Sequence, residues 1–361
     1  MSIRSATSAS MPLDEVLARL FAVAPVDTIL VPVREGIGLV LAEDAVALVD
    51  HPAAPRARRD GWAVAAGDVT GASPYAPVTP RGPPSWVEDG DAMPPGADTV
   101  LPPDAIGPEG DIVSDAAQGE GVSRVGQDVV LGDVLARAGE RLTSLRSLAL
   151  LGAGIDTVVV RTPRIHIVGI GTGSASAVAD WVAAAGGQVT SSASARDGES
   201  IAAALRAREA DAVFVVGGTG FGRTDHSAEA LARVGHLDAH GIALHPGESA
   251  GFGRIGTVPV LLLPGRPDAA LATFLALGRP LLARLSGAVP PGAVEGRLTR
   301  KITSTVGVSE IVFVRRTQGG VEPIGGGDLP LRRLILAEGA VLVPPEREGY
   351  PEGEWIEIVP L

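Results

Sequence analysis

Apolar residues near the start of the chain recur at helical spacing. A predicted helix of about three turns carries Leu13, Val16, Leu17, Leu20 and Phe21 on one face. From residue 28 to residue 121 the apolar runs are short and are interrupted by many prolines and glycines. This pattern predicts the short strands and loops of a small β-rich domain. The stretch LTSLRSLALLGAG then predicts a connecting helix that ends at Gly152 and Gly154.

From Pro163 the pattern changes to a repeated strand, loop and helix. Strands are expected at 165–170, 212–216 and 258–263, and helices at 175–185, 199–208 and 268–285. Such βα units predict a parallel sheet with helices on both faces and a ligand site at the carboxyl ends of the strands. From Pro290 onward short apolar runs return and predict a second small β domain.

Composition and charge narrow the classes of function. The chain has 361 residues, of which 45% are hydrophobic and only 3% aromatic, with 47 Gly, 29 Pro and no cysteine. This is a globular, turn-rich composition that excludes disulfides, thiolate metal sites and thiol catalysis. The net charge of -12 argues against nucleic acid as a partner. Because the sequence shows neither a secretory signal nor a long apolar run, we expect a cytoplasmic protein without a membrane-bound part.

Three glycine-rich loops follow the three predicted strands, so we expect them along one edge of the sheet. The first, GIGTGS, departs from a dinucleotide fingerprint because Ser174 stands at the third glycine position. Ser191 and Ser192 stand where an acid would bind the ribose, which argues against a nicotinamide oxidoreductase. The alternative to a phosphate cradle is a tight strand-to-helix turn.

The second and third loops carry charged side chains. In GGTGFGRTD, Asp225 either holds Mg²⁺ or orients a nucleophile, or it is only the N-cap of the following helix. In LPGRP, Arg266 either binds an anion or is a solvated side chain in a proline-bounded turn. His166, within an apolar strand, is expected to be a hydrogen-bonded structural histidine.

A series of short motifs resembles one protein family. In order, RRDGWAV, DAMPPGADTVL, GQDVVLGDVLARAGERL, GIGTGS, GGTGFGRTD, HPGESAGFG and LPGRP are similar to those of the molybdopterin molybdenumtransferases, the family of bacterial MoeA and the gephyrin E domain. The resemblance extends from Pro12 to Pro360 and includes the closing AEGAVLVPPEREGYPEGEWIEIV.

The resemblance implies a multidomain α/β plus β protein. Its expected parts are a linker and dimerisation domain (1–46 and 121–160), a β-rich insert (47–120), a three-layer α/β molybdopterin-binding domain with a parallel-type sheet (161–287), and a barrel-like C-terminal β domain (288–361). It also implies a homodimer in which the insert of one subunit faces the α/β domain of the other. Asp60, in DGWA, matches an aspartate at that shared cleft.

The family reaction inserts molybdate into adenylylated molybdopterin and releases AMP, with Mg²⁺ assisting. The resemblance implies catalytic roles for Asp225 and Asp60, and a Mg²⁺ contact for Asp225. The residues that would bind the pterin substrate are Gly171, Thr172, Gly173, Ser174, Gly217, Gly218, Thr219, Gly220, Gly222, Pro246, Gly247, Pro264, Gly265, Arg266 and Pro267. The finished cofactor would pass to a molybdoenzyme apoprotein.

The departures from the family pattern favour an alternative. Ser174 and Ala175 stand where the family usually has an Asp-Glu pair, Gly220 replaces a serine, and Lys-Pro-Gly-Lys-Pro becomes the turn HPGES. Fewer carboxylates weaken a Mg²⁺ site, and fewer lysines weaken attraction for the molybdate dianion. Arg266, Asp89 and Asp91 are candidate replacements for these charges. The chain is therefore either a transferase or a binding and carrier protein that has kept the pterin cleft without the catalysis.

Overall fold

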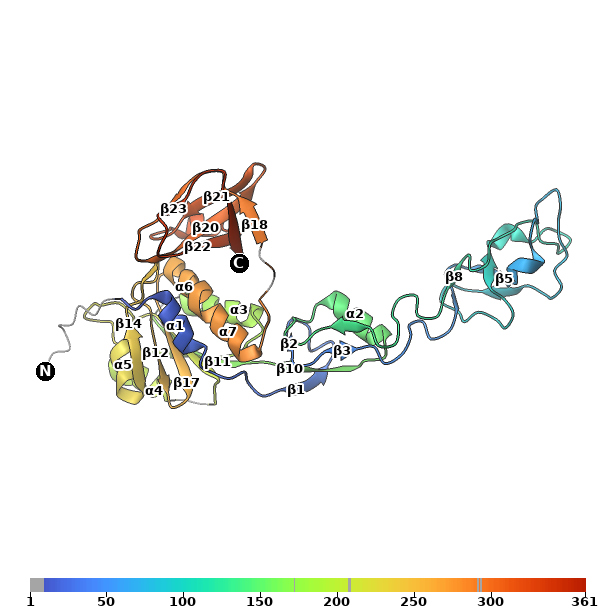
Figure 1. Ribbon diagram of the computed structural model, residues 1–361. Coiled ribbons are helices and arrows are strands. Elements are labelled where there is room, and N and C mark those ends of the chain that lie inside the picture. The colour runs from blue at the N-terminus through green and yellow to red at the C-terminus, as the bar shows by residue number, and fades with distance from the viewer. Residues whose placement is uncertain (1–9, 172, 207–208, 291, 293) are drawn as a thin grey trace.

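The computed structural model describes residues 10–171, 173–206, 209–290, 292 and 294–361. In Figure 1 the molecule is elongated, with an α/β domain and a C-terminal β domain stacked at one end and the β-rich insert at the other. A narrow linker domain lies between them. The chain passes through the linker twice, because β1 (Ile29–Pro32) and β2 (Val40–Leu41) of the first passage pair with β10 (Thr157–Arg161) of the second. The expected multidomain α/β plus β architecture is confirmed.

The α/β domain is built on one six-stranded sheet. Its strand order is β12–β11–β13–β17–β16–β14; the first four strands pair in parallel, and the pairings of β17 with β16 and of β16 with β14 are antiparallel. The strands are β11 (Arg164–Ile170), β12 (Gln188–Ser194), β13 (Ala212–Val216), β14 (His236–His240), β16 (Gly251–Ile255) and β17 (Val258–Leu263). The three strands predicted from their apolar runs are confirmed, and the sheet is mixed rather than wholly parallel.

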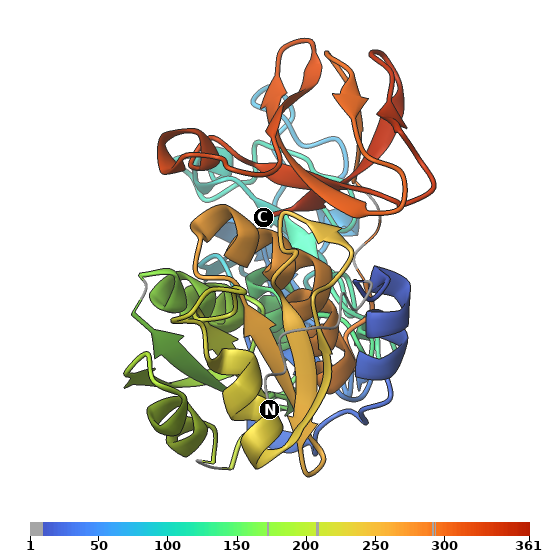
Figure 2. The same cartoon turned by 90° about the vertical axis from the view of Figure 1, so that its left-hand side faces the viewer.

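Helices cover both faces of this sheet (Figures 1 and 2). Alternate residues of each strand point to opposite faces. Ile167, Phe214 and Leu261 belong to one core, while Val168, Val215 and Leu262 belong to another. The first core packs against α1 (Leu13–Leu20), α3 (Ser174–Ala184) and the long helix after β17, and the second packs against α4 (Gly198–Leu205) and α5 (Ser227–Val234). The range 1–46 thus contributes its first helix to the α/β domain.

The long helix after β17 contains a π-helical turn. It consists of α6 (Pro267–Thr273), a π segment (Phe274–Gly278) and α7 (Arg279–Ser286). Pro280 explains the irregularity, because proline lacks the N–H of a regular helical hydrogen bond and its ring collides with the carbonyl four residues earlier. By length and composition the helix Pro267–Ser286 would be able to cross a membrane, but 78% of its most apolar window is buried inside the structure.

The C-terminal β domain shares a strand with the α/β domain. Its sheet runs β15–β20–β22–β24–β18, and β21 pairs with β20. β15 (Leu244–His245) belongs to the HPGES segment of the α/β domain, yet it pairs in parallel with β20. The other elements are β18 (Val294–Arg297), β19 (Ile302–Thr303), β20 (Ser309–Thr317), β21 (Gly320–Gly325), α8 (Leu331–Leu334), β22 (Gly339–Val343), β23 (Gly349–Tyr350) and β24 (Trp355–Pro360). The two domains therefore meet directly beside the HPGES turn.

The linker and the insert are made of short strands, as their proline and glycine content predicts. The linker contains β1 (Ile29–Pro32), β2 (Val40–Leu41), β3 (Ala45–Val46), β9 (Val134–Ala136), α2 (Ser144–Gly152) and β10 (Thr157–Arg161). The insert contains β4 (Arg56–Ala57), β5 (Gly61–Val64), β6 (Ser85–Val87), β7 (Thr99–Leu101) and β8 (Val122–Ser123), with 3-10 turns at Ala66–Asp68 and Pro103–Ala105.

Candidate functional site

The three glycine-rich loops lie together at the carboxyl edge of the parallel strands. The Ser174 hydroxyl, at the start of α3, donates to the Gly265 carbonyl oxygen over 2.9 Å and joins the first loop to the third. The Gly217 N–H donates to the Leu263 carbonyl oxygen over 2.9 Å and joins the second loop to the third. The predicted convergence on one edge is therefore confirmed.

The first loop leads into the N-terminus of α3. Gly171 has φ +56°, a left-handed conformation that favours glycine, and Gly173 is the N-cap of α3. Thr172 lies outside the described residues. Arg196, in the loop between β12 and α4, donates to the Gly171 carbonyl oxygen over 3.1 Å. An exposed guanidinium and the first N–H groups of a helix thus lie beside this loop, which is an arrangement that attracts anions.

Arg196 was missed by the sequence analysis. Its neighbour Asp197 caps α4 by accepting from the Ser200 N–H over 2.8 Å. An N-cap signal of this kind marks the loop as a strand-to-helix connection, but β12 before it was not predicted. Arg223, in the second loop, is also exposed, and neither arginine forms an ion pair with any residue the structure describes.

The second loop is held by its own hydrogen bonds. Ser227, the first residue of α5, donates its hydroxyl to the Gly217 carbonyl oxygen over 2.8 Å. Thr219 is only 2% exposed, and its hydroxyl contacts that of Ser249 at 3.3 Å. The His240 ring contacts the Thr219 carbonyl oxygen at 2.8 Å. Thr219 therefore helps to fix the loop against the HPGES turn.

Asp225 closes a tight turn within the second loop. One of its carboxylate oxygens, Oδ2, accepts from the Gly222 N–H over 3.1 Å. A Cβ atom on Gly220 would lie 2.6 Å from this oxygen, and one on Gly222 would lie 2.8 Å from it. The N-cap position of α5 is His226, so the alternative role of Asp225 as N-cap is wrong. The Oδ1 atom makes no hydrogen bond with the described residues and stays able to accept one.

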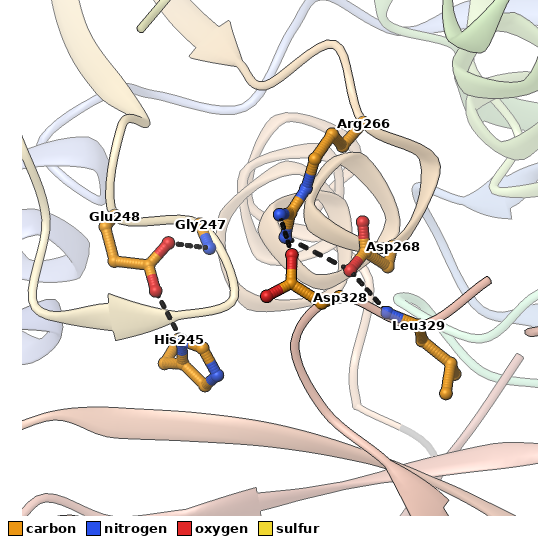
Figure 3. A network of polar contacts seen from close by, with 7 residues as sticks. All are labelled: His245, Gly247, Glu248, Arg266, Asp268, Asp328 and Leu329. Atoms are coloured by element: carbon orange, nitrogen blue, oxygen red, sulfur yellow. Dashed lines mark hydrogen bonds and ion pairs between the residues drawn. The ribbon is translucent and has the colours of Figure 1, made fainter. Parts of the chain in front are cut away.

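A hydrogen bond between His245 and Glu248 holds the HPGES turn (Figure 3). The His245 Nδ1 atom bonds the Glu248 carboxylate, whose second oxygen accepts from the Gly247 N–H over 3.2 Å. Burial alone would raise the pKa of Glu248, but the bonds from His245 and from the backbone N–H groups outweigh it, so this pKa lies below its usual value. Pro246 and Gly247 are buried, and Gly247 has φ +134°. A Cβ on Gly247 would lie 2.9 Å from the Thr273 hydroxyl.

In the third loop, Arg266 faces two carboxylates (Figure 3). It lies between Pro264 and Pro267 and bonds Asp328 of the C-terminal domain. It also donates to Asp268 over 3.2 Å. Asp268 is 3% exposed and accepts from the Leu329 N–H over 3.1 Å. The charge of Arg266 is thus largely matched, and this side chain links the two domains.

Asp60 directly precedes β5 in the insert, and Figure 1 shows β5 at the opposite end of the molecule from the α/β domain. Its carboxylate accepts from the Asp89 N–H over 2.8 Å, and Asp91 accepts from the Glu88 N–H over 2.9 Å. A single subunit therefore does not bring Asp60 and Asp225 together. Among the described residues no group of three or more His, Asp or Glu side chains is placed to hold a metal ion.

His166 is a structural residue, as predicted. It is 7% exposed within β11. Its two ring nitrogens contact the hydroxyls of Thr190 and Ser192 in β12, at 2.9 and 3.0 Å.

Comparisons with known proteins match three successive parts of the chain to regions of one protein family. The profile of the "MoeA N-terminal region (domain I and II)" matches residues 11–154, that of the "probable molybdopterin binding domain" matches 170–284, and that of the "MoeA C-terminal region (domain IV)" matches 295–361. A putative molybdopterin biosynthesis protein of Methanocaldococcus jannaschii is 27% identical over 369 residues, covering 91% of each chain. Molybdopterin molybdenumtransferase 1 of Mycobacterium tuberculosis is 27% identical over 409 residues, covering 93% of this chain and 95% of the relative.

Solved structures give the same result. The molybdopterin biosynthesis MoeA protein of Pyrococcus horikoshii superposes with a TM-score of 0.73 and 27% identity. The match covers 97% of this chain and 99% of that one. The likeness therefore includes the insert and the C-terminal domain as well as the glycine loops.

Proposed function

The chain belongs to the MoeA family and to molybdenum cofactor biosynthesis, and from this premise we propose that it is a molybdopterin molybdenumtransferase. Its reaction would insert molybdate into adenylylated molybdopterin and release AMP. The observation that carries the proposal is the meeting of three glycine-rich loops and the HPGES turn at one sheet edge, in a chain that matches the family from residue 11 to residue 361.

The chain's own part in this reaction would be binding and positioning. The N-terminus of α3, with Arg196 beside it, suits a phosphate group of the substrate. The backbone N–H groups of the second loop lie next to it, and Asp225 offers one unbonded carboxylate oxygen. Holding molybdate and the activated pterin side by side would accelerate the reaction by proximity and by stabilising the leaving phosphate.

Mg²⁺ fits this site only in part. Mg²⁺ commonly uses one or two carboxylates together with substrate phosphates, and Asp225 supplies one such carboxylate. When bound, the ion would neutralise charge on the phosphates. Because Ser174 and Ala175 replace the family's usual acid pair, we expect weaker Mg²⁺ binding than a typical site gives.

A homodimer would complete the site. Several large apolar side chains of the linker domain are exposed, among them Leu30 (67%), Leu145 (78%) and Leu148 (69%). Burial of such a surface favours association. In a dimer of the family type, Asp60 of one subunit would face the glycine loops of the other. If this is right, Leu148→Glu will yield a monomer in sedimentation velocity, and a wild-type monomer would contradict it.

Three finer points complete the proposal. The α/β domain would be three-layered and the C-terminal domain barrel-like, as in the family description. The protein would work in the cytoplasm without a nucleic-acid or membrane partner. The product would then pass to a molybdoenzyme apoprotein.

The test is AMP release from adenylylated molybdopterin, with Mg²⁺, in the presence and absence of molybdate. We expect molybdate-dependent release, and a loss of about tenfold or more in rate for Asp225→Asn, because the variant removes a charge close to the reacting phosphate. Tight binding of the pterin without AMP release would reject the transferase and support a carrier. An undiminished rate for Asp225→Asn would reject only the role of that residue.

A further inference from the structure

Apart from the glycine loops, a pocket of about 700 Å³ lies between the linker domain, α3 and the helix α6–α7. It lies at the C-terminal end of α3, whereas the first glycine loop lies at the N-terminal end. Its lining includes three arginines, Arg141, Arg146 and Arg279. It also includes apolar side chains, among them Trp181, Leu271 and Phe274. Within the described part of the chain, Glu140 is the one acidic side chain that lines it.

Two of the three arginines of this pocket have no acidic partner among the described residues. Arg146 pairs with Glu140 over 2.9 Å. Arg141 donates instead to two backbone carbonyl oxygens, those of Gly38 and, over 2.9 Å, Ala185. Arg279 donates to the Pro360 carbonyl oxygen over 2.6 Å. Neither Arg141 nor Arg279 forms an ion pair with a residue that the structure describes.

Keeping these two charges together costs free energy. Burial lowers the pKa of the Arg141 guanidinium. Burial also lowers the pKa of Arg279, and the nearby positive charge of Arg141 lowers it further. Two like charges in partly desolvated positions are unfavourable unless a counter-charge approaches them. An anion in the pocket would supply that counter-charge.

The backbone at this place is also irregular. The π segment Phe274–Gly278 ends directly before Arg279, and Phe274 lines the pocket. Single π turns inside helices occur frequently at functional sites. Here the turn results from Pro280, and it sets the position of Arg279 relative to Phe274.

From these features we propose that the pocket binds an aromatic phosphate of the nucleoside monophosphate class, with its phosphate on Arg279 and Arg141 and its ring against Trp181. A guanidinium fork matches phosphate oxygens in pairs. Trp181 and Phe274, with ring centroids 5.6 Å apart, supply aromatic surface to the same pocket that the arginines line. Pockets of this volume that combine an apolar wall with a few polar groups are typical small-molecule sites.

The proposal is tested by calorimetric titration of the full chain with three probes: AMP, adenosine and inorganic phosphate. AMP should bind more tightly than either of its parts. Arg279→Gln should weaken AMP binding at this site by at least about tenfold, because it removes charged hydrogen bonds. The AMP affinity of Arg279→Lys should lie between those of the wild type and Arg279→Gln, because lysine keeps the charge but loses the paired N–H groups of the guanidinium. Arg316→Gln, an exposed arginine on β20, is the matched control and should have no effect.

Two further variants keep the test decisive if an Arg279 variant folds poorly. Trp181→Leu should weaken AMP binding and leave the binding of inorganic phosphate unchanged. Asp225→Asn, in the glycine loops, should leave the Arg279-dependent binding intact, which separates this pocket from the transferase site. AMP binding that is lost in Asp225→Asn but unchanged in Arg279→Gln would overturn the proposal. Loss of self-association in Arg279→Gln with unchanged AMP affinity would also overturn it, because the arginines would then face a second copy of the chain.

Discussion

Replacing Asp268 by alanine should loosen the contact between the α/β domain and the C-terminal β domain. Asp268 is buried in the first turn of α6, where a negative charge is favoured by about 0.3–1 kcal/mol. Its bond from the Leu329 N–H is a buried bond to a charged acceptor, worth about 1.5–3 kcal/mol. Its ion pair with Arg266, which is 53% exposed, adds at most about 1 kcal/mol. We therefore expect a loss of about 3 kcal/mol in the local stability of this contact.

Hydrogen exchange at the Leu329 amide measures this local opening. In Asp268→Ala the amide should exchange about a hundredfold faster than in the wild type, since about 1.4 kcal/mol corresponds to a factor of ten. Asp328→Asn is the control, because Asp328 is 86% exposed and bonds Arg266 without bonding Leu329, and asparagine tolerates its left-handed φ of +54°. Its effect should stay below about fivefold. Equal effects of the two variants, or unchanged exchange in Asp268→Ala, would refute the assignment of Asp268 as the buried link between the domains.

Three more outcomes are expected. Gly220→Ser should lower the melting temperature by several degrees, because the new Cβ would lie 2.6 Å from the Asp225 carboxylate, and an unchanged melting temperature would show that Asp225 is free to move. Glu248→Gln should have a lower free energy of unfolding in urea than the wild type above pH 4.5. This difference in free energy should disappear as the pH falls through the depressed folded-state pKa of Glu248. A difference that does not change with pH would exclude the His245–Glu248 bond as the cause of the lower stability. Arg196→Ala should raise the KM for adenylylated molybdopterin about tenfold with little change in kcat, whereas an unchanged KM would mean that Arg196 holds only the loop.

The apolar pattern predicts the centre of the α/β domain well and its edges poorly. β13 is fully buried, and β11 and β17 are mostly buried apolar runs; glycine or proline follows each of the three, so their positions were predicted to within a residue or so. β12, by contrast, reads QVTSSAS and has only partly buried and exposed residues. Its pairing with β11 depends on contacts such as those of His166 with Thr190 and Ser192, more than 20 residues away in the sequence. An edge strand of this kind has no apolar signal.

The electrostatics of the site were harder to predict, for a similar reason. Arg266 looked like a free cation in LPGRP, but its partner Asp328 is 62 residues away and belongs to another domain. The link exists because β15, in the α/β segment, joins the sheet of the C-terminal domain and brings the loop after β21 against α6. No local sequence signal gives that pairing. Short-range partners such as His245 and Glu248, three residues apart, lie within reach of sequence reasoning.

These pairings change where the substrates should bind. In a site with free lysines, the HPGES turn would be the natural place for the molybdate dianion, but here His245 is already bonded to Glu248 and Arg266 to Asp268 and Asp328. An oxyanion that binds at this turn must compete with carboxylates already in place, which weakens its affinity. At this edge of the sheet, Arg196 and Arg223 have no acidic partner among the described residues, and they lie in the loops next to the α3 N-terminus and Asp225. Charge therefore favours tight binding of the phosphorylated pterin and weak binding of molybdate.

A transferase built in this way should show a high KM for molybdate that rises further with ionic strength, because attraction between charges in a solvent-exposed site is screened by salt. A molybdate KM that does not depend on salt would place the dianion in a buried position away from these loops.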